Sequence, residues 1–359
     1  MPIAEVRTHL LRVPLHTPFV TALRRTTVVE TLVVELVDSD GRSGFGEAPQ
    51  VWQVTGASIA GARACVTEVL APLLTGRDPG DLVARTAEVR RAVAGNEAAK
   101  AAVDTALHDL AARQLGVPLV RLLGGTTLRV PTDVTLAAGD ADDLAVTASQ
   151  RVRDGFRVIK LKVGADAAGD LARIRAVRAA LGPGVRLRLD ANQGWTPREA
   201  VRIIRDAEDA GLDLELVEQP VPHWDIDGLA WVSDRVDVPI MADEAVFGVR
   251  DLVEVIRRRA ADMVNVKLAK CGGIGPARTL LELAAAYDVG TIVGSMMETG
   301  IGVGAAASLA AAYGTTATPD LDAAWWLASS PTAGGLRYEA AEVVLPDAPG
   351  LGVTGLTAS

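Results

Sequence analysis

The sequence has few cysteines and no extended basic segment. Only two cysteines, Cys65 and Cys271, occur among 359 residues, which is too few for a disulfide framework, and their spacing does not suit metal ligands. Acidic residues outnumber basic ones by 45 to 36, so the formal net charge is −9. The longest basic run is residues 257–259, whereas nucleic-acid binding requires clustered Lys and Arg. We therefore expect no nucleic-acid partner and a reducing, cytoplasmic location.

The sequence also lacks a long, strongly apolar segment. Its longest uncharged stretch, residues 299–319, consists mainly of Gly, Ala, Ser and Thr, which is typical of a closely packed helix and not of a membrane span. Glu5, Arg7 and Arg12 leave no apolar core of the signal-peptide kind near the first residue. Apolar residues make up 49% of the chain and charged residues 23%, which excludes global disorder. The length allows two domains, or one large barrel with an appendage.

The first third of the chain predicts a small α+β domain. Residues 6–13 and 31–37 are rich in β-branched residues with partial alternation, and residues 38–41, Asp-Ser-Asp-Gly, are turn formers. From residue 58 to residue 115 apolar residues recur at helical spacing. We assign residues 1–120 to this domain. We expect residues 336–359 to complete it, with a strand over residues 337–345.

From residue 130 onward the pattern changes to strands alternating with amphipathic helices, with a period of about 25 to 30 residues that is typical of βα units. Residues 171–181 carry an apolar stripe that Gly182 ends, and residues 196–199, Thr-Pro-Arg-Glu, combine an N-cap, a first-turn proline and a glutamate, which predicts a helix start. The predicted strands are residues 158–163, 187–190, 214–218, 240–243, 263–267 and 291–295. Because no dinucleotide-binding glycine motif is present, this α/β pattern favours a closed (β/α) barrel, or TIM barrel, over residues 121–335.

Two lysines lie at the end of the strand predicted for residues 158–163. The period of two in a strand places Lys160 and Lys162 on one face, directed toward the barrel interior. In a barrel, functional groups lie at the C-terminal ends of the strands. Each ammonium disfavours the charge on the other, which is expected to lower a lysine pKa and make it a base near neutral pH. A partly solvated strand end is the alternative interpretation.

Three carboxylates follow three successive predicted strands: Asp190, Glu218 and Asp243. At one rim they would repel one another unless a cation lies between them, and ligation by oxygen alone suits Mg²⁺. Any one of them alone would more often be a helix N-cap than a ligand. Their recurrence at the same place in three βα units therefore predicts a Mg²⁺ site.

Lys267 ends the strand predicted for residues 263–267, several strands around the barrel from Lys162. We expect the two lysines to face the site from opposite sides. That arrangement suits removal of a proton from one face of a carbon and its return to the other face, with Mg²⁺ as the Lewis acid that stabilises an enediolate. Lys270 lies beyond the strand end and is expected to be structural, and the role of Glu244 stays open.

The order of these motifs resembles the enolase superfamily, and within it the muconate-lactonizing-enzyme-like subgroup. The resemblance covers nearly the whole chain. It is carried by residues 160–162 (Lys-Leu-Lys), 189–192 (Leu-Asp-Ala-Asn), 217–220 (Val-Glu-Gln-Pro), 242–244 (Ala-Asp-Glu) and 265–267 (Asn-Val-Lys), with Gly272 and Gly273 following. It implies a modified (β/α)₇β barrel with an N-terminal α+β capping domain, and the superfamily is itself a known example of a Lys base combined with Mg²⁺. Lys267 stands where the mandelate-racemase-like branch has a catalytic histidine, which disfavours an acid-sugar dehydratase.

Asp320 and Asp322 resemble the Asp-x-Asp signature of dipeptide epimerases. In that family the pair holds the α-ammonium of the substrate, while Mg²⁺ holds its C-terminal carboxylate. Without the resemblance, two aspartates two residues apart would as readily cap the following helix. The resemblance therefore implies a dipeptide as the small-molecule partner.

Residues 18–24 resemble the capping-domain loop of L-Ala-D/L-Glu epimerases, in which an arginine at the position of Arg24 pairs with the glutamate side chain of the substrate. Arg25 is adjacent, and one of the two arginines can be a solvated surface charge only. Phe19 and Met297 are candidates for the pocket wall, with plain packing as the alternative role. Glu298 follows the seventh strand, and we expect it to contact Lys267 or the substrate.

With the resemblance, these residues predict a Mg²⁺-dependent dipeptide epimerase that inverts the α-carbon of the C-terminal residue, with L-Ala-D/L-Glu as the leading substrate. Turnover of peptidoglycan peptides would fit such a substrate. Lys162 and Lys267 would exchange acid and base roles, and Lys160 would offset the enolate charge. The main alternatives are an N-succinylamino-acid racemase and an o-succinylbenzoate synthase, whose N-acylated or ammonium-free substrates do not need Asp320 and Asp322. A muconate cycloisomerase or a non-catalytic binding barrel ranks below them. The sequence leaves homo-oligomer formation open.

Overall fold

The N-terminal part of the computed structural model, which describes residues 1–357, is a three-stranded antiparallel sheet with helices packed against it. Its elements are β1 (Ile3–Val20), β2 (Arg25–Asp38), β3 (Ser43–Pro49), α1 (Ile59–Ala64), the π-helix η1 (Cys65–Leu70), α2 (Ala71–Leu74), α3 (Leu82–Ala92) and α4 (Glu97–Leu115). Strand β2 leads into β3 through the predicted turn, where Asp38 Oδ1 accepts the backbone amides of Asp40 and Arg42, each at 2.9 Å. We call residues 1–120 the capping domain.

Helix α4 lies directly on β3 because two glycines of the strand leave room for it. A Cβ on Gly46 would lie 1.9 Å from the backbone oxygen of Ala102, and a Cβ on Gly44 would lie 2.5 Å from that of Ala106. No side chain fits at either position. Leucines of β2 and α4 complete a buried apolar cluster with this close contact, so the capping domain has a core of its own.

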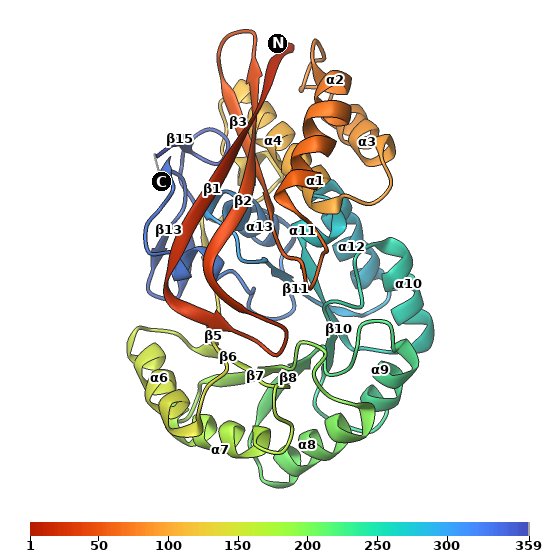
Figure 1. Ribbon diagram of the computed structural model, residues 1–359, viewed down its shortest axis with the longest axis vertical. Coiled ribbons are helices and arrows are strands. Elements are labelled where there is room, and N and C mark those ends of the chain that lie inside the picture. Colours follow the sequence, from red (N-terminus) through yellow and green to blue (C-terminus); the bar gives the residue numbers. More distant parts are fainter. Residues whose placement is uncertain (358–359) are drawn as a thin grey trace.

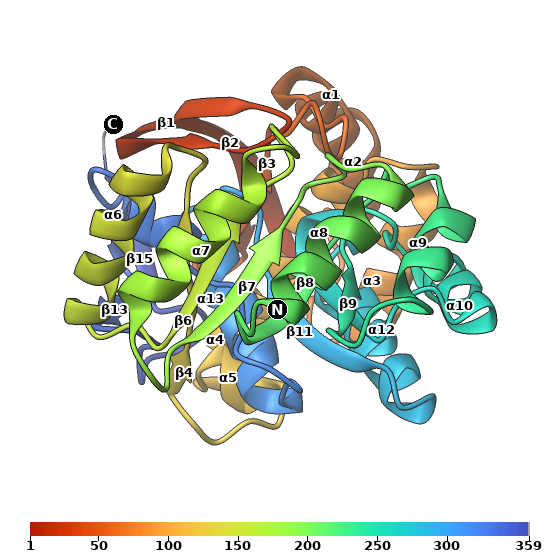
Figure 2. The ribbon, with the colours of Figure 1, turned by 90° about the horizontal axis from the view of Figure 1, so that it is seen from below.

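The second part of the described chain is a curved sheet of seven parallel strands in the order β11-β10-β9-β8-β7-β6-β5. The strands are β5 (Val134–Leu136), β6 (Val158–Lys162), β7 (Arg186–Asp190), β8 (Leu214–Glu218), β9 (Ile240–Ala242), β10 (Met263–Lys267) and β11 (Gly290–Gly294). The helices are α5 (Leu119–Leu122), α6 (Ala141–Arg153), α7 (Asp170–Leu181), α8 (Pro197–Asp209), α9 (Ile226–Ser233), α10 (Val249–Arg258), α11 (Leu268–Cys271), α12 (Ile274–Ala286) and α13 (Gly300–Tyr313). Figure 2 shows helices such as α7 and α8 on the outer side of the strands.

The predicted barrel elements are confirmed. Each of the six predicted strands coincides with one of β6 to β11 to within two residues at either end. Helix α7 ends at Gly182, and α8 begins with the predicted capping box, in which Thr196 and Glu199 bond each other's backbone amides. Within residues 1–357, no helix combines the length and apolar character needed to cross a membrane.

The barrel closes through a single bridge and not through a full eighth strand. Asp320 forms a parallel bridge with Gly294 at the end of β11. The backbone amide of Asp133, just before β5, donates to the carbonyl oxygen of Pro319 at 3.1 Å. Asp320 therefore lies at the seam between the last and the first strand of the barrel.

The interior of the barrel has an apolar side and a polar side. Toward β8 to β11 it is filled by a buried cluster of Leu216, Met241, Met263 and Ile292. Toward β5 to β7 it holds Arg188, whose guanidinium lies 2.9 Å from Asp133 Oδ2 and 2.7 Å from Glu215 Oε2. Arg188 and Asp133 are both fully buried, and loss of one partner of such a pair costs about 3–5 kcal/mol. The polar side thus supports the end of β6, where Arg188 is the register partner of Lys160.

The C-terminal segment packs against both parts of the chain. It contains the 3₁₀ helix η2 (Ala323–Trp326), β12 (Thr332–Gly334), β13 (Arg337–Glu339), β14 (Glu342–Val344) and β15 (Val353–Leu356), and β14 also pairs with β4 (Arg129–Pro131). The prediction of one strand over residues 337–345 is wrong, because the chain reverses at Ala340, whose φ is 52°. Toward the capping domain, the backbone amide of Leu351 donates to Asp109 Oδ1 at 2.6 Å. The domain boundaries at residues 120 and 335 stay predictions.

The far ends of β1 and β2 extend from the sheet of the capping domain toward the ends of the barrel strands (Figure 1). We call residues 14–29 the hairpin tip. In its turn, the backbone amide of Thr21 donates to the Arg24 carbonyl at 2.9 Å, and the Thr21 hydroxyl accepts the Arg24 amide at 3.2 Å. The Val20 carbonyl accepts the backbone amide of Ala138, which follows β5, at 2.9 Å. The tip is therefore bonded to the barrel.

Candidate active site

A pocket lies between the hairpin tip and the C-terminal ends of the barrel strands. Residues from the capping domain, from the strand ends and from the seam of the barrel meet there. Its lining consists of Phe19, Thr21, Leu23, Arg24, Val54, Thr135, Lys160, Lys162, Asn192, Asp243, Glu244, Lys267, Ser295, Met296, Met297, Asp320, Asp322 and Ala323. Most of the candidate residues singled out from the sequence thus share one cavity.

Three buried lysines line this pocket. Lys160 and Lys162 lie on β6 and Lys267 ends β10, with β7, β8 and β9 between the two strands, so Lys162 and Lys267 approach from opposite sides. Their side chains need anionic partners, because an unpaired buried ammonium is costly. Lys162 pairs with Asp190, Lys160 pairs with Asp320, and Lys267 Nζ lies 2.6 Å from Asp243 Oδ2.

The surrounding carboxylates raise the pKa of two of these lysines. Burial disfavours the ammonium of Lys160, but Asp320 and Glu218 outweigh burial and raise its pKa well above the usual value. Burial acts in the same way on Lys267, and there Asp243 and Glu218 raise the pKa. The expectation that a neighbouring ammonium group would lower the lysine pKa is wrong for Lys160, because the nearest charges are anions.

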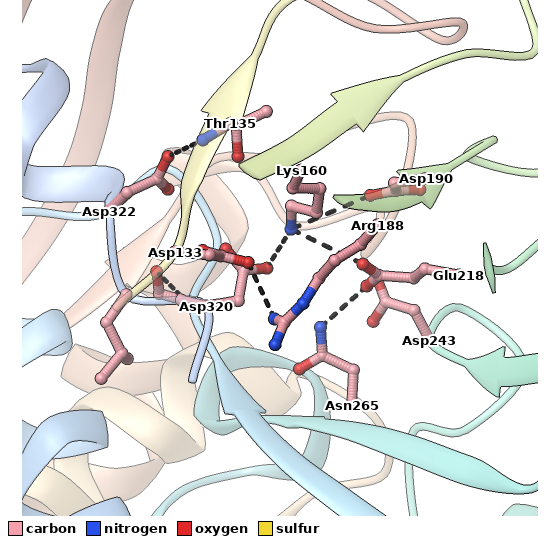
Figure 3. A network of polar contacts seen from close by, with 12 residues as sticks. Asp133, Thr135, Lys160, Arg188, Asp190, Glu218, Asp243, Asn265, Asp320 and Asp322 are labelled. Carbon is pink, nitrogen blue, oxygen red and sulfur yellow. Dashed lines mark hydrogen bonds and ion pairs between the residues drawn. The ribbon is translucent and has the colours of Figure 1, made fainter. Parts of the chain in front are cut away.

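The three carboxylates predicted to bind a metal lie at the ends of neighbouring strands (Figure 3). Asp190 and Glu218 are register partners across β7 and β8, and Asp243 directly follows β9. All three are buried, and lysines are their nearest cations: Lys270 Nζ lies 2.6 Å from Asp243 Oδ1 and Lys160 Nζ lies 3.5 Å from Glu218 Oε2. Burial and the charge of Asp190 raise the pKa of Glu218 to about 7. Three buried carboxylates on neighbouring strands supply the oxygen ligands that Mg²⁺ prefers.

A second group of carboxylates lies at the seam of the barrel (Figure 3). Oxygens of Asp133, Asp320 and Asp322 come within 4.8 Å of one another, close enough to hold a cation. All three already have protein donors: Asp133 pairs with Arg188, Asp320 pairs with Lys160, and Asp322 Oδ2 accepts the backbone amide of Thr135 at 2.8 Å. Burial and the charge of Asp320 raise the pKa of Asp133 well above its usual value. Because Asp320 and Asp322 reach the pocket wall, this group makes one end of the pocket anionic.

The hairpin tip contributes a cation to the lining of the pocket. Arg24 is half-buried and lines the pocket, and no carboxylate within residues 1–357 forms an ion pair with it. Burial lowers the pKa of Arg24, and the charge of Glu244 opposes that shift. Arg25 is exposed and is absent from the lining of the pocket, so the two adjacent arginines differ in their environment. Phe19 and Met297 line the pocket and also pack together with Trp326, so both of the roles considered for them apply.

Glu298 does not belong to the described lining of the pocket. Its Oε1 accepts the backbone amide of Met296 at 3.2 Å, and burial together with Glu47 raises its pKa to about 8. Glu47, from β3 of the capping domain, accepts the backbone amides of Thr299 and Gly302 at 2.8 and 2.7 Å, at the start of α13. Glu298 thus lies behind the pocket wall, where the capping domain meets the barrel.

Comparison with known proteins places the chain in a family. Residues 3–124 match the mandelate racemase / muconate lactonizing enzyme N-terminal domain, and residues 143–357 match the enolase C-terminal domain-like family. The chain belongs to the enolase superfamily. The predicted barrel with an N-terminal capping domain is confirmed by these matches, and it is the fold of this superfamily.

Two solved enolase-superfamily structures and one curated relative are similar to the chain over nearly its whole length. The L-Ala-D/L-Glu epimerase of Bacillus subtilis is 42% identical over 99% of this chain and 97% of its own length. The structure of a substrate-liganded complex of that epimerase superimposes with a TM-score of 0.97 and covers 100% of both chains. A dipeptide epimerase from Enterococcus faecalis V583, complexed with Mg and L-Leu-L-Tyr, is 36% identical with a TM-score of 0.94, over 99% of this chain and 100% of its own.

Two residues that the sequence does not single out as candidates, Lys270 and Asn265, contact the carboxylates of the site. Lys270 was expected to be structural, but helix α11 turns it back so that its Nζ lies 2.6 Å from Asp243 Oδ1. Asn265 Nδ2 donates to Glu218 Oε1 at 2.8 Å (Figure 3). Spacing is the signal for both: Asn265 lies two residues before Lys267 on the same strand face, and Lys270 lies one helical turn after it.

The loops after β7 and β8 contain residues in left-handed backbone conformations, and one of them, Asn192, lines the pocket. Asn192, Gln193 and Gln219, which follow β7 and β8, have φ values of 41°, 70° and 35°. Such conformations are unfavourable for residues other than glycine and persist where surrounding contacts hold them. Asn192 Nδ2 donates to Glu244 Oε1 at 3.2 Å. Burial and the charge of Asp243 raise the pKa of Glu244 to about 8.

Proposed function

We propose that the chain is a Mg²⁺-dependent dipeptide epimerase that inverts the α-carbon of the C-terminal residue, with L-Ala-D/L-Glu as the leading substrate. One observation carries the proposal: two buried lysines, Lys162 and Lys267, approach from opposite sides a pocket whose wall also contains Asp320 and Asp322. Similarity to the L-Ala-D/L-Glu epimerase of B. subtilis over nearly the whole of both chains supports it.

A lysine on each side of the α-carbon allows inversion by two proton transfers. One lysine, in its neutral form, removes the α-proton from one face, and the ammonium of the other delivers a proton to the opposite face. The pairing of Lys267 with Asp243 raises the pKa of Lys267 and stabilises the ammonium form that the donor needs. Lys160 stays positively charged between its carboxylates and offsets the negative charge that develops on the substrate.

Asp190, Glu218 and Asp243 would hold Mg²⁺. When bound, the ion supplies Lewis-acid stabilisation of negative charge on the substrate carboxylate. The Mg-containing complex of the E. faecalis dipeptide epimerase supports this assignment. Because a ligand of the native state stabilises it, we expect Mg²⁺ to raise the melting temperature and EDTA to lower it. An unchanged melting temperature in both would contradict a metal site.

The two ends of the pocket fit the two ends of an acidic dipeptide. Asp320 and Asp322 would bind the α-ammonium, because a free ammonium needs a local excess of anions. Arg24 would bind the carboxylate of the second side chain, with Phe19 and Met297 packing beside the substrate. The two unpaired buried cysteines support the cytoplasmic location expected from the sequence.

Exchange of the α-proton tests the proposal directly. In D₂O with Mg²⁺, the enzyme should incorporate deuterium at the α-carbon of the C-terminal residue of L-Ala-L-Glu, which NMR or mass spectrometry detects. N-acetyl-L-Ala-L-Glu is the matched control, because it lacks only the free ammonium. The absence of exchange across a panel of dipeptides would contradict the proposal, and exchange confined to N-succinylamino acids would identify a racemase of the alternative kind.

A further inference from the structure

Trp326 holds one of the aspartates on the pocket wall although it does not itself line the pocket. It ends η2 and is 4% exposed. Its indole Nε1 donates to Asp322 Oδ2 at 3.0 Å, and the backbone amide of Thr135 donates to the same oxygen at 2.8 Å. No donor to Asp322 Oδ1 occurs within residues 1–357. The two donors therefore fix the carboxylate through one oxygen and leave the other for a ligand.

The ring of the Trp326 indole contacts the hairpin tip. The His16 ring stacks on the indole with 5.4 Å between centroids and 13° between planes, and Phe19 meets it edge-on at 5.3 Å and 83°. The backbone amide of Ala328, two residues after Trp326, donates to the Pro14 carbonyl of the tip at 2.9 Å. Aromatic contacts of these kinds have a defined geometry. The orientation of the indole therefore depends on the position of the tip.

The hairpin tip in turn carries two residues of the pocket, Phe19 and Arg24. The Phe19 ring lies 5.8 Å from Lys162 Nζ. The indole of Trp326 thus contacts both Asp322 on the pocket wall and the hairpin tip, which carries Arg24. Neither Trp326 nor His16 belongs to the residues on which the proposed chemistry depends.

We infer that Trp326 is a positioning residue that couples binding of a substrate ammonium at Asp322 to docking of the hairpin tip over the pocket. This inference rests on the proposed function, because it assigns the ammonium to Asp322. Coupling between two sites is reciprocal. If docking of the tip strengthens the binding of a ligand to Asp322, then binding of that ligand favours the docked tip by the same free energy. A dipeptide with a free ammonium therefore stabilises the docked tip, and its N-acetylated analogue does not.

Two substitutions separate the indole N–H from the aromatic ring. Trp326→Phe keeps a ring against His16 and Phe19 but removes the donor to Asp322, and Trp326→Leu removes both. For Trp326→Phe with Mg²⁺, we expect KM for L-Ala-L-Glu to rise about tenfold while kcat stays within about twofold, because a hydrogen bond to a charged group in the binding site is lost. Trp231→Phe, on the outer helix α9, is the matched control and should change neither constant.

Limited trypsin digestion provides a second readout that is independent of turnover, because the hairpin tip contains Arg24 and Arg25. Mass spectrometry of the peptides cut after these arginines measures local opening of the tip. In the wild type, L-Ala-L-Glu with Mg²⁺ should slow this cleavage severalfold, and N-acetyl-L-Ala-L-Glu should not. Trp326→Phe should be cut at the wild-type rate without ligand but lose the protection, and Trp326→Leu should be cut faster even without ligand.

The outcomes distinguish the coupling from the proposed function. An active wild type in which both peptides protect the tip equally would overturn the coupling, as would an unchanged KM and unchanged protection in Trp326→Phe. A wild type that neither exchanges an α-proton nor is protected by any dipeptide would reject the proposed function itself. Trp326→Phe keeps the packing of the ring, so the test stands even if Trp326→Leu does not fold.

Discussion

The rim of the barrel and the hairpin tip contribute to the same pocket in different ways. At the rim, the polar groups lie at or next to the ends of strands, are buried, and are fixed by ion pairs or register partners, as with Lys162 and Asp190. The tip contributes Arg24 from a turn, without an ion-pair partner in residues 1–357, and the tip is held by aromatic contacts and backbone hydrogen bonds to residues distant in sequence. Strand geometry thus holds the groups proposed for the chemistry, whereas a turn holds the group proposed for substrate choice.

The largest effect is expected at the rim. Lys162→Ala and Lys267→Ala should each lower kcat for epimerisation by about 10²–10⁴-fold, the usual contribution of a general acid or base. Chiral chromatography of the two L-Ala-Glu epimers measures the rate. Lys100→Ala is the matched control, because Lys100 is also buried and paired, with Glu97, but lies in α4 of the capping domain. A variant of Lys162 or Lys267 that kept most of its rate would break the assignment of chemistry to the rim.

The anionic end of the pocket should show the next largest effect. Asp320→Asn removes one of two carboxylates near the substrate ammonium, and it should raise KM for L-Ala-L-Glu by about ten- to a hundredfold, as expected for a lost charged hydrogen bond. The effect on N-acetyl-L-Ala-L-Glu should be much smaller, because that peptide carries no ammonium. Equal effects on both peptides would show that Asp320 acts mainly through its ion pair with Lys160.

Substrate choice at the tip can be tested with two adjacent arginines. Arg24→Gln should raise KM for L-Ala-L-Glu about tenfold and leave KM for L-Ala-L-Gln nearly unchanged, because only the former has a carboxylate for the guanidinium. Arg25→Gln alters an exposed arginine and should affect neither peptide. If Arg24→Gln lowered kcat for both peptides, the tip would take part in the chemistry and the contrast with the rim would fail.

The smallest effect is expected at the junction of the two regions, and it concerns stability. The pKa of Glu298 is raised from 4.5 to about 8, so the folded state keeps a proton that the unfolded state has lost between these values. Stability therefore falls as pH rises through this window. Melting temperatures measured from pH 5 to pH 8 should fall less steeply for Glu298→Gln, about as expected for removal of one titrating group. Glu68→Gln, at an exposed position, should keep the wild-type slope.

Much of the rim is predictable from the sequence. A short apolar segment between two amphipathic helices is readily identified as the strand of a βα unit. The strand predicted for residues 214–218, for example, coincides with β8. The period of two then assigns Lys160 and Lys162 to one face without further information. The residues Thr196 and Glu199 also suffice to predict the start of α8, because both hydrogen bonds of a capping box form within four consecutive residues.

Other features depend on contacts that a local pattern does not contain. The reversal at Ala340 uses a left-handed conformation that alanine does not favour, so residues 337–345 have the composition of one strand although they form two. Asp320 belongs to the barrel through one bridge, which is too short to give a strand pattern. The contact of Trp326 with His16 joins positions about 310 residues apart, so neither neighbourhood indicates the other.

The burial of the lysines has a consequence for chemical labelling. The chain has five lysines, and Lys100, Lys160, Lys162, Lys267 and Lys270 are all buried, so the exposed side-chain cations are arginines and histidines. Reagents that acylate lysine amines therefore meet no exposed lysine on the folded surface. Lysine acylation in this protein should report entry into the pocket or opening of the chain, and attachment chemistry that relies on surface lysines should fail until the fold is lost.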